Sequence, residues 1–210
     1  EHAPCALTYP QHEEAVYSEG VFVGYRYYEK KRLPVRFAFG HGLSYTAFSY
    51  GNMKLDKAEM TDQDTLTVSF DVTNTGSMEG KEIAQLYVRD VEASVPRPVK
   101  ELKNFVKVAL QPGEKKHIEM KLSKRAFAFY HVGMQNWYAE DGAYEILVGA
   151  ASDDIRLSAS VTVHSTVKPE KHYNEYVTMG ELMRLPKAQP FLSAMNTSAT
   201  PAPAMTREEM

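Results

Sequence analysis

The feature that most constrains this chain is a strict alternation of apolar and polar residues near its middle. Between Thr65 and Val72, every second residue is apolar, and the residues between them are Thr, Ser or Asp. Because successive side chains of a β-strand point to opposite faces, this pattern predicts a strand with one buried and one solvated face. A period of two residues argues against an amphipathic helix at this place.

Further strand-like segments follow at short intervals, separated by residues typical of turns. The turn signals are Asn74-Thr75-Gly76, Gln111–Glu114 and Asp141-Gly142. The strand-like segments are residues 83–88, 105–110, 118–122, 144–148 and 157–163. Six or seven short strands with no helical spacing between them predict an all-β sandwich of the immunoglobulin or fibronectin type III kind.

The apolar side chains on the buried faces of these strands form the expected core. They are Leu66, Val68, Phe70, Val72, Leu86, Val88, Val106, Val108, Ile118, Met120, Tyr144, Ile146, Val148 and Val161. The Cys…Trp…Cys signature of true immunoglobulin domains is absent, because Cys5 is the only cysteine and Trp137 the only tryptophan. We expect Trp137 to anchor the end of a strand, although a sugar-stacking role remains the alternative.

Composition divides the chain into four regions, of which only the second reads as repeated strands. The regions are a connector at residues 1–47, the sandwich at 48–164, a helical extension at 165–195 and a disordered tail at 196–210. The connector contains a strand-like run at 21–28, and the extension contains a short amphipathic helix at 175–183 with Thr178 as a possible N-cap. The tail is too small and polar to bury an apolar surface.

Several classes of function are disfavoured by charge and residue spacing. A net charge of −3 argues against a nucleic-acid partner, and no apolar run approaches the length of a membrane span. The seven histidines are scattered without ligand spacing, and one cysteine permits neither an internal disulfide nor a cysteine cluster. The acidic residues lie mainly in predicted turns or on polar faces. We therefore expect no catalytic residue, no metal site and no cofactor in this chain, and the compartment stays open.

Stretches in the first two regions together resemble one family of enzymes. They are EGVFVGYRYY at 19–28, FGHGLSY at 39–45, SVPRPVKELKNF at 94–105 with LQPGE after it, and DGAYEILVGAASDD at 141–154. In sequence, order and spacing they resemble the C-terminal region of family-3 glycoside hydrolases, the β-glucosidase family, over roughly residues 15–164. That resemblance implies a parent enzyme with a (β/α)8 barrel, then an α/β domain, then a fibronectin type III-like domain.

The resemblance also implies what this region does and lacks. In the family the nucleophilic aspartate lies on the barrel and the general acid usually on the α/β domain, so no catalytic residue transfers to this chain. The expected partners are those two domains of a retaining β-glucosidase, with a β-glucoside as the expected substrate, reached only through the parent. β-Xylosides and N-acetylglucosaminides remain the alternative substrates. The chain would then be a non-catalytic accessory domain. The alternative is a free-standing carbohydrate-binding or adhesion module, which predicts a row of exposed aromatic residues on the sandwich face.

The connector carries more large side chains than a short segment can bury alone, and such surfaces usually mark a partner. We expect an interdomain contact there, with self-association possible when it is uncovered. The residues assigned to this contact are Phe22, Tyr25, Arg26, Tyr27, Tyr28, Phe39 and Tyr45. Gly40 and Gly42 are expected to make a sharp, close-packed turn that admits no Cβ atom.

Overall fold

The computed structural model describes residues 19–169, 177–183 and 186–197. The chain divides into two compact units, residues 1–168 and residues 169–210. None of the helices in the described ranges is long and apolar enough to span a membrane.

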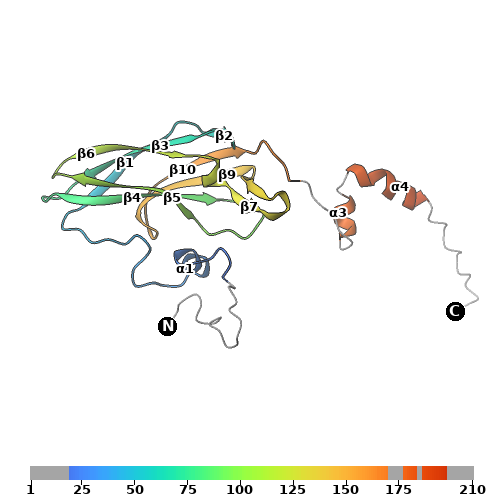
Figure 1. Cartoon of the computed structure of the whole chain (residues 1–210), viewed down its shortest axis with the longest axis horizontal. Helices are drawn as coiled ribbons and strands as arrows, with labels where there is room; N and C mark the ends of the chain where they lie inside the picture. Colours follow the sequence, from blue (N-terminus) through green and yellow to red (C-terminus); the bar gives the residue numbers. More distant parts are fainter. Residues whose placement is uncertain (1–18, 170–176, 184–185, 198–210) are drawn as a thin grey trace, which may run out of the picture. The chain divides into compact units, whose positions relative to one another are not determined.

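The first unit is a sandwich of two sheets with a small hairpin at one end (Figure 1). One sheet has three antiparallel strands in the order β1 (Phe48–Leu55), β3 (Leu66–Asn74), β6 (Lys115–Leu122). The other has the order β2 (Glu59–Thr61), β10 (Asp154–His164), β9 (Gly142–Ala151), β4 (Gly80–Asp90), β5 (Glu101–Leu110). The hairpin consists of β7 (Phe129–His131) and β8 (Asn136–Tyr138), joined by the 3-10 turn η1 (Val132–Met134). This architecture confirms the predicted all-β sandwich.

The core lies between the two sheets and follows the predicted alternation. In β3 the residues alternate strictly between buried and half-buried, from Leu66 to Asn74. All predicted core residues are buried except Val106 and Val108, which are half-buried on β5. β5 is an edge strand with a neighbour on one side only, so its side chains are less covered. Phe127, from the short helix α2 (Lys124–Phe127), is a buried core residue that the alternation did not indicate.

A buried carboxylate ties the end of β2 to the segments after β10 and β6. Asp62 lies 2.6 Å from the Lys124 ammonium and accepts hydrogen bonds from the backbone N–H and hydroxyl of Thr166. Burial alone would raise the pKa of Asp62, but the hydrogen bonds from Lys124 and Thr166 outweigh it and lower that pKa to about 2. Asp62 therefore has a structural role in fixing the loop ahead of β3.

A β-bulge interrupts β1. The pairing of β1 with β3 shifts register between Gly51 and Lys54, and Asn52 adopts a left-handed backbone with φ of 56°. The Asn52 amide donates a hydrogen bond of 2.7 Å to Asp71 on β3. Asparagine tolerates the left-handed region better than most residues, so the bulge is encoded locally.

The predicted strand-like run at 21–28 is wrong, because a helix, α1, occupies Tyr25–Lys31. The alternation of Val21, Val23 and Tyr25 was compatible with a strand, but Tyr25 and Tyr28 are also three residues apart, as on one face of a helix. Gly24 precedes the helix with φ of 60°, and Arg32 ends it in the left-handed region. Contacts with the sandwich, described below, hold this short helix in place.

The described part of the second unit contains two short helices. α3 (Met179–Met183) is followed by the 3-10 turn η2 (Pro186–Ala188) and by α4 (Gln189–Thr197). Thr178 precedes α3, and its carbonyl accepts a hydrogen bond of 3.0 Å from the Leu182 N–H. The helix predicted at 175–183 therefore begins at Met179 in the described part, while 175–176 lie outside it. α4 reaches two residues into the segment expected to be disordered; the remainder of that segment, 198–210, lies outside the described residues.

Candidate interdomain surface

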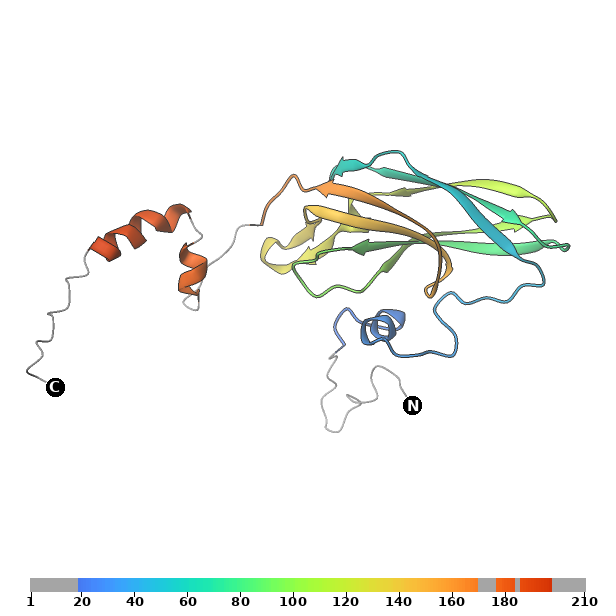
Figure 2. The same ribbon diagram turned by 180° about the vertical axis from the view of Figure 1, so that it is seen from behind.

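The connector helix packs on the outer face of the five-stranded sheet, away from the three-stranded sheet (Figures 1 and 2). The Tyr25 ring stacks on Phe39 with centroids 4.7 Å apart and meets the edge of the Tyr87 ring at 6.2 Å. The Tyr25 hydroxyl oxygen accepts a hydrogen bond of 2.8 Å from the Leu102 N–H on β5. One side chain thus contacts both β4 and β5.

Two ion pairs join the same helix to Glu101, the first residue of β5, and to Lys100, the residue before that strand. Arg26 lies 3.3 Å from Glu101, and Glu29 lies 2.8 Å from Lys100. All four side chains are at most about a third exposed, so these pairs are less screened than ordinary surface pairs. Helix α1 is therefore part of the sandwich unit rather than a free linker.

The segment after α1 covers the middle of β4. The Gln85 amide donates to the carbonyl oxygens of Ala150, at 2.6 Å, and Gly40, at 3.4 Å. The Tyr87 hydroxyl donates to the Gln85 side-chain oxygen at 2.6 Å. Gly40 has φ of 82°, and a Cβ atom there would collide with the Gln85 amide, as expected for a close-packed turn. At Gly42 the expectation is wrong, because its surroundings are open and its φ is not positive.

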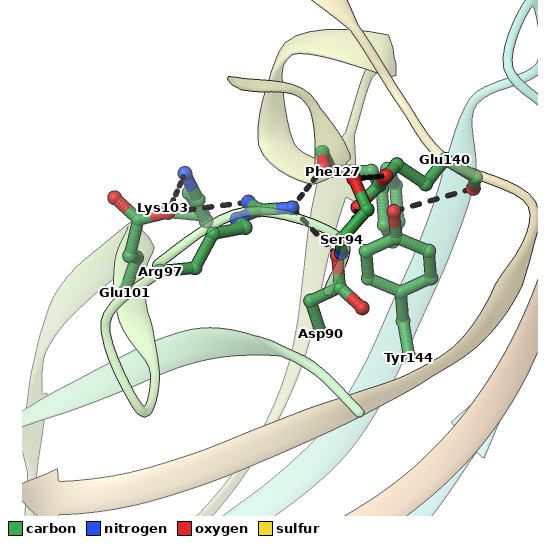
Figure 3. Close-up of polar contacts among 8 residues, drawn as sticks. All are labelled: Asp90, Ser94, Arg97, Glu101, Lys103, Phe127, Glu140 and Tyr144. Atoms are coloured by element: carbon green, nitrogen blue, oxygen red, sulfur yellow. Dashed lines mark hydrogen bonds and ion pairs between the residues drawn. The ribbon is translucent and has the colours of Figure 1, made fainter. Parts of the chain in front are cut away.

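A buried cluster of charges anchors the loop that joins β4 to β5 (Figure 3). The Arg97 guanidinium donates to Asp90 at 2.9 Å, to the Phe127 carbonyl oxygen at 3.0 Å and to Glu101 at 3.3 Å. The side chains of Arg97 and Asp90 are only 8% and 5% exposed. Glu101 is also bound by Lys103 at 3.2 Å. We call these groups the Arg97 cluster, and each of its charged side chains is paired with an opposite charge of the same chain.

The pKa values in the Arg97 cluster follow from burial and charge. Burial raises the pKa of Asp90, and the attraction of Arg97 opposes this only in part. Burial also acts to raise the pKa of Glu101, but Lys103, Arg26 and Arg97 together hold it below its usual range. Burial lowers the pKa of Lys103, against the attraction of Glu101. The cluster is thus explained as a structural ion-pair network without assigning it a proton-transfer role.

The other end of the same loop is held by Glu140. The Ser94 N–H donates to the Glu140 carboxylate at 3.1 Å, and the Ser94 hydroxyl donates to its other oxygen. The hydroxyl of Tyr144 donates to the Glu140 carbonyl oxygen at 3.3 Å (Figure 3). With Arg97 on one side and Glu140 on the other, the loop between β4 and β5 is fixed at both ends.

Large apolar side chains nevertheless remain exposed around the connector. Leu43 and Tyr45 are 93% and 95% exposed. On the sheet beside the connector, Gln85 pairs with Phe105 and Ile83 with Lys107, so Ile83 and Phe105 are diagonal neighbours on the outer face. We define the connector face as six of the exposed apolar residues of this region: Phe37, Phe39, Leu43, Tyr45, Ile83 and Phe105. The connector residues Val21, Val23, Leu33 and Val35 are also exposed.

The residues expected at an interdomain contact fall into three groups. Tyr25 and Arg26 contact the chain's own sandwich, as described above. Tyr27 and Tyr28 are half-buried and meet edge to face at 6.0 Å, and Phe22 is half-buried with the Lys30 ammonium 5.8 Å from its ring centroid. Only Phe39 and Tyr45 belong to the connector face. Its sheet residues, Ile83 and Phe105, were missed because the sequence does not show which face of β4 and β5 the connector covers.

Two other candidate sites, a metal site and a sugar-stacking site, have less support in the structure. Within the described ranges, no group of three or more His, Cys, Asp or Glu residues is placed to hold a metal ion. Trp137 packs against the core, and the Arg125 guanidinium lies 3.0 Å from the centroid of its ring. Tyr130 meets the same ring at 5.6 Å. This arrangement favours the strand-end anchor over a sugar-stacking platform, since Arg125 covers one face of the ring.

Comparisons with known proteins identify the domain and its relatives. Residues 82–152 match the family described as fibronectin type III-like domain. Over 183 residues, the chain is 48% identical to thermostable β-glucosidase B of Acetivibrio thermocellus, covering 87% of this chain and 24% of that protein. It is 45% identical over 156 residues to a probable β-glucosidase I of Aspergillus fumigatus, covering 72% of this chain and 18% of the relative. The chain thus spans less than a quarter of the length of either relative.

Solved structures show the same relationship. The crystal structure of a family 3 β-glucosidase from Bifidobacterium adolescentis superposes with a TM-score of 0.76 at 37% identity, covering 90% of this chain and 28% of that one. A β-glucosidase from Kluyveromyces marxianus, solved in complex with glucose, superposes with a TM-score of 0.70 at 39% identity over 77% of this chain and 19% of that one. This chain contains a fibronectin type III-like domain and is homologous to the part of the family 3 β-glucosidases that carries this domain.

Proposed function

We propose that this chain serves as a non-catalytic accessory domain of a β-glucosidase and braces a catalytic domain through the connector face. The observation that carries the proposal is the split within the connector. Its helix is fastened to the sandwich by two ion pairs, whereas Leu43 and Tyr45, which follow the Gly40 turn held by Gln85, are almost fully exposed. A rigidly held segment that presents bare apolar side chains has the character of an interface.

The proposed parent activity is hydrolysis of terminal β-D-glucosyl residues with retention of configuration. The names of the relatives support the substrate class, and the retaining mechanism follows from the resemblance alone. Its proposed partners are the barrel and α/β domains of the parent enzyme, and the acid and nucleophile would lie there. In this chain the carboxylates of Asp90 and Glu101 are both bound to the buried Arg97 guanidinium, which suits a structural role.

A chimeric enzyme tests the proposal. In it, this chain replaces the matching segment of the Acetivibrio thermocellus β-glucosidase B, to which it is 48% identical. We expect the chimera to hydrolyse an aryl β-glucoside, and the isolated chain to have no activity. Leu43→Ser should lower the Tm of the chimera but not the Tm of the isolated chain, because Leu43 is exposed until its partner covers it.

Val167→Ser is the matched control. Val167 is exposed and follows β10, whereas the connector touches the β9–β10 turn at the opposite end of that strand through the hydrogen bond from Ser152 to Phe39. Equal Tm values for the Leu43 and Val167 variants of the chimera would contradict the brace. Retention of the isolated chain on an insoluble β-glucan would instead support the alternative, a carbohydrate-binding module.

A further inference from the structure

We propose that the surface docked by the connector face is an acidic protein surface that inserts an apolar side chain beside α1. This inference rests on the proposed function and adds the chemistry of the partner. Residues 25–36 contain five basic residues and one acidic residue, a net charge of +4, in a chain whose net charge is −3. The rest of the chain therefore carries −7, and the connector is a local basic region in an otherwise acidic molecule.

Most of this positive charge forms no ion pair within the described part of the chain, although Lys30 and Arg36 each lie 5.8 Å from the centroid of an aromatic ring, Phe22 and Phe37. Arg26 is paired with Glu101, and the one acid of the segment, Glu29, is engaged by Lys100. The four other basic residues are exposed and form no ion pair with another described residue. They are Lys30, Lys31, Arg32 and Arg36.

The C-terminal end of helix α1 can stabilise only two of these four positive charges. Lys30 and Lys31 lie in the last turn of α1, where the carbonyl end of the helix favours cations. Arg32 and Arg36 lie beyond the last helical residue, and α1 is one of the short helices, so this benefit is small. A basic rim next to exposed apolar side chains is instead complementary to an acidic surface.

The shape beside α1 indicates how such a surface engages. A groove of about 500 Å³ runs between α1 and the segment that follows it. Its lining is mostly aromatic and aliphatic, with Arg32 among the polar members and Glu29 and Asp153 as the acidic ones. The apolar lining residues are Tyr25, Tyr28, Leu33, Val35, Phe37 and Phe39. Apolar anchors that fill such a groove, surrounded by polar contacts, are typical of protein–protein hot spots.

Neutralising the rim in the chimera tests the inference. The test variant carries Lys30→Gln, Arg32→Gln and Arg36→Gln, which remove the charge but keep a polar side chain, and at Lys30 in the helix glutamine has a similar helix propensity. The control carries Lys54→Gln, Lys115→Gln and Lys121→Gln, three exposed lysines of the three-stranded sheet. At about 0.02 M salt, where screening is weak, we expect the test variant to lose roughly 2–4 °C in Tm relative to the control. At about 1 M salt the difference should vanish.

The outcomes separate the inference from the proposed function. If Leu43→Ser lowers the Tm of the chimera and the neutralised rim does not, the brace stands and the acidic partner is refuted. If neither does, both are refuted. If the isolated chain dimerises at low salt and the neutralised rim abolishes the dimer, the acidic surface belongs to a second copy of this chain, which overturns the assignment to another domain.

Discussion

Replacing Arg97 by methionine is the most informative single change, because it removes one charge from a buried set. Methionine retains much of the apolar volume of the arginine stem, so the variant tests charge rather than packing. Asp90, only 5% exposed, loses its bound cation, and the Phe127 carbonyl oxygen loses its donor. Glu101 keeps Arg26 and Lys103. The loss therefore falls mainly on Asp90.

The magnitude follows from that uncompensated carboxylate. Removing one partner of a buried pair costs about 3–5 kcal/mol, whereas an exposed pair is worth about 0–1 kcal/mol. The same β4 strand offers the exposed case, because Arg89 pairs with Glu145 at 3.1 Å. We expect Arg97→Met to lower the free energy of unfolding of the isolated chain by about 3–5 kcal/mol, and Arg89→Met by less than about 1 kcal/mol.

The pH dependence gives a second signature. Burial already raises the pKa of Asp90 in the folded state, and loss of Arg97 raises it further. The folded variant then binds a proton that the unfolded chain releases, so its stability deficit should shrink as pH falls from 7 toward about 4. Urea unfolding of both variants across this range measures it. Equal losses for Arg97→Met and Arg89→Met, or a deficit independent of pH, would refute the account of a buried cluster.

Three further predictions concern the core, the connector and the loop before β3. Phe70→Ala should cost about 3–5 kcal/mol in urea unfolding, because Phe70 is fully buried, while Phe105→Ala at an exposed position should cost far less. Gly40→Ala should speed amide exchange in the connector and Gly42→Ala should not, since only Gly40 has a positive φ and a close neighbour. Because the pKa of Asp62 is lowered to about 2, its contribution to stability is present above its ordinary pKa and is lost as pH falls toward 2. Asp62→Asn should therefore reduce the loss of stability over this pH range.

The sandwich was predictable from sequence because most of its strands have one buried face. In β3 and β6 the alternation of apolar residues reads directly as burial. β4 departs from this pattern, since Ala84–Val88 are all buried. The inner face is covered by the core and the outer face by the connector, so the continuous burial there is a tertiary effect.

Other features depend on contacts that no local pattern encodes. Helix α1 is held by residues such as Tyr87 and Leu102, far along the chain. The Arg97 cluster joins residues from β4, the following loop, β5 and α2. In the sequence its charged residues look like those of any solvated strand or turn. The connector could be recognised from its aromatic content, but its docked and exposed residues could not be told apart without the three-dimensional arrangement.

The free edges of the two sheets limit how this molecule can misassociate. An unprotected edge strand offers unpaired backbone groups to another chain, and short length, bulges and lysines oppose such pairing. Here β2 has three residues, β1 is broken by the bulge at Asn52, and β6 carries Lys115, Lys116 and Lys121. The fourth edge, β5, carries Lys107, and its Leu102 N–H is already bound to the Tyr25 hydroxyl. Contact between copies through backbone pairing at these edges is thereby disfavoured, so an uncovered connector face would promote reversible side-chain contacts rather than growth of a continuous intermolecular sheet.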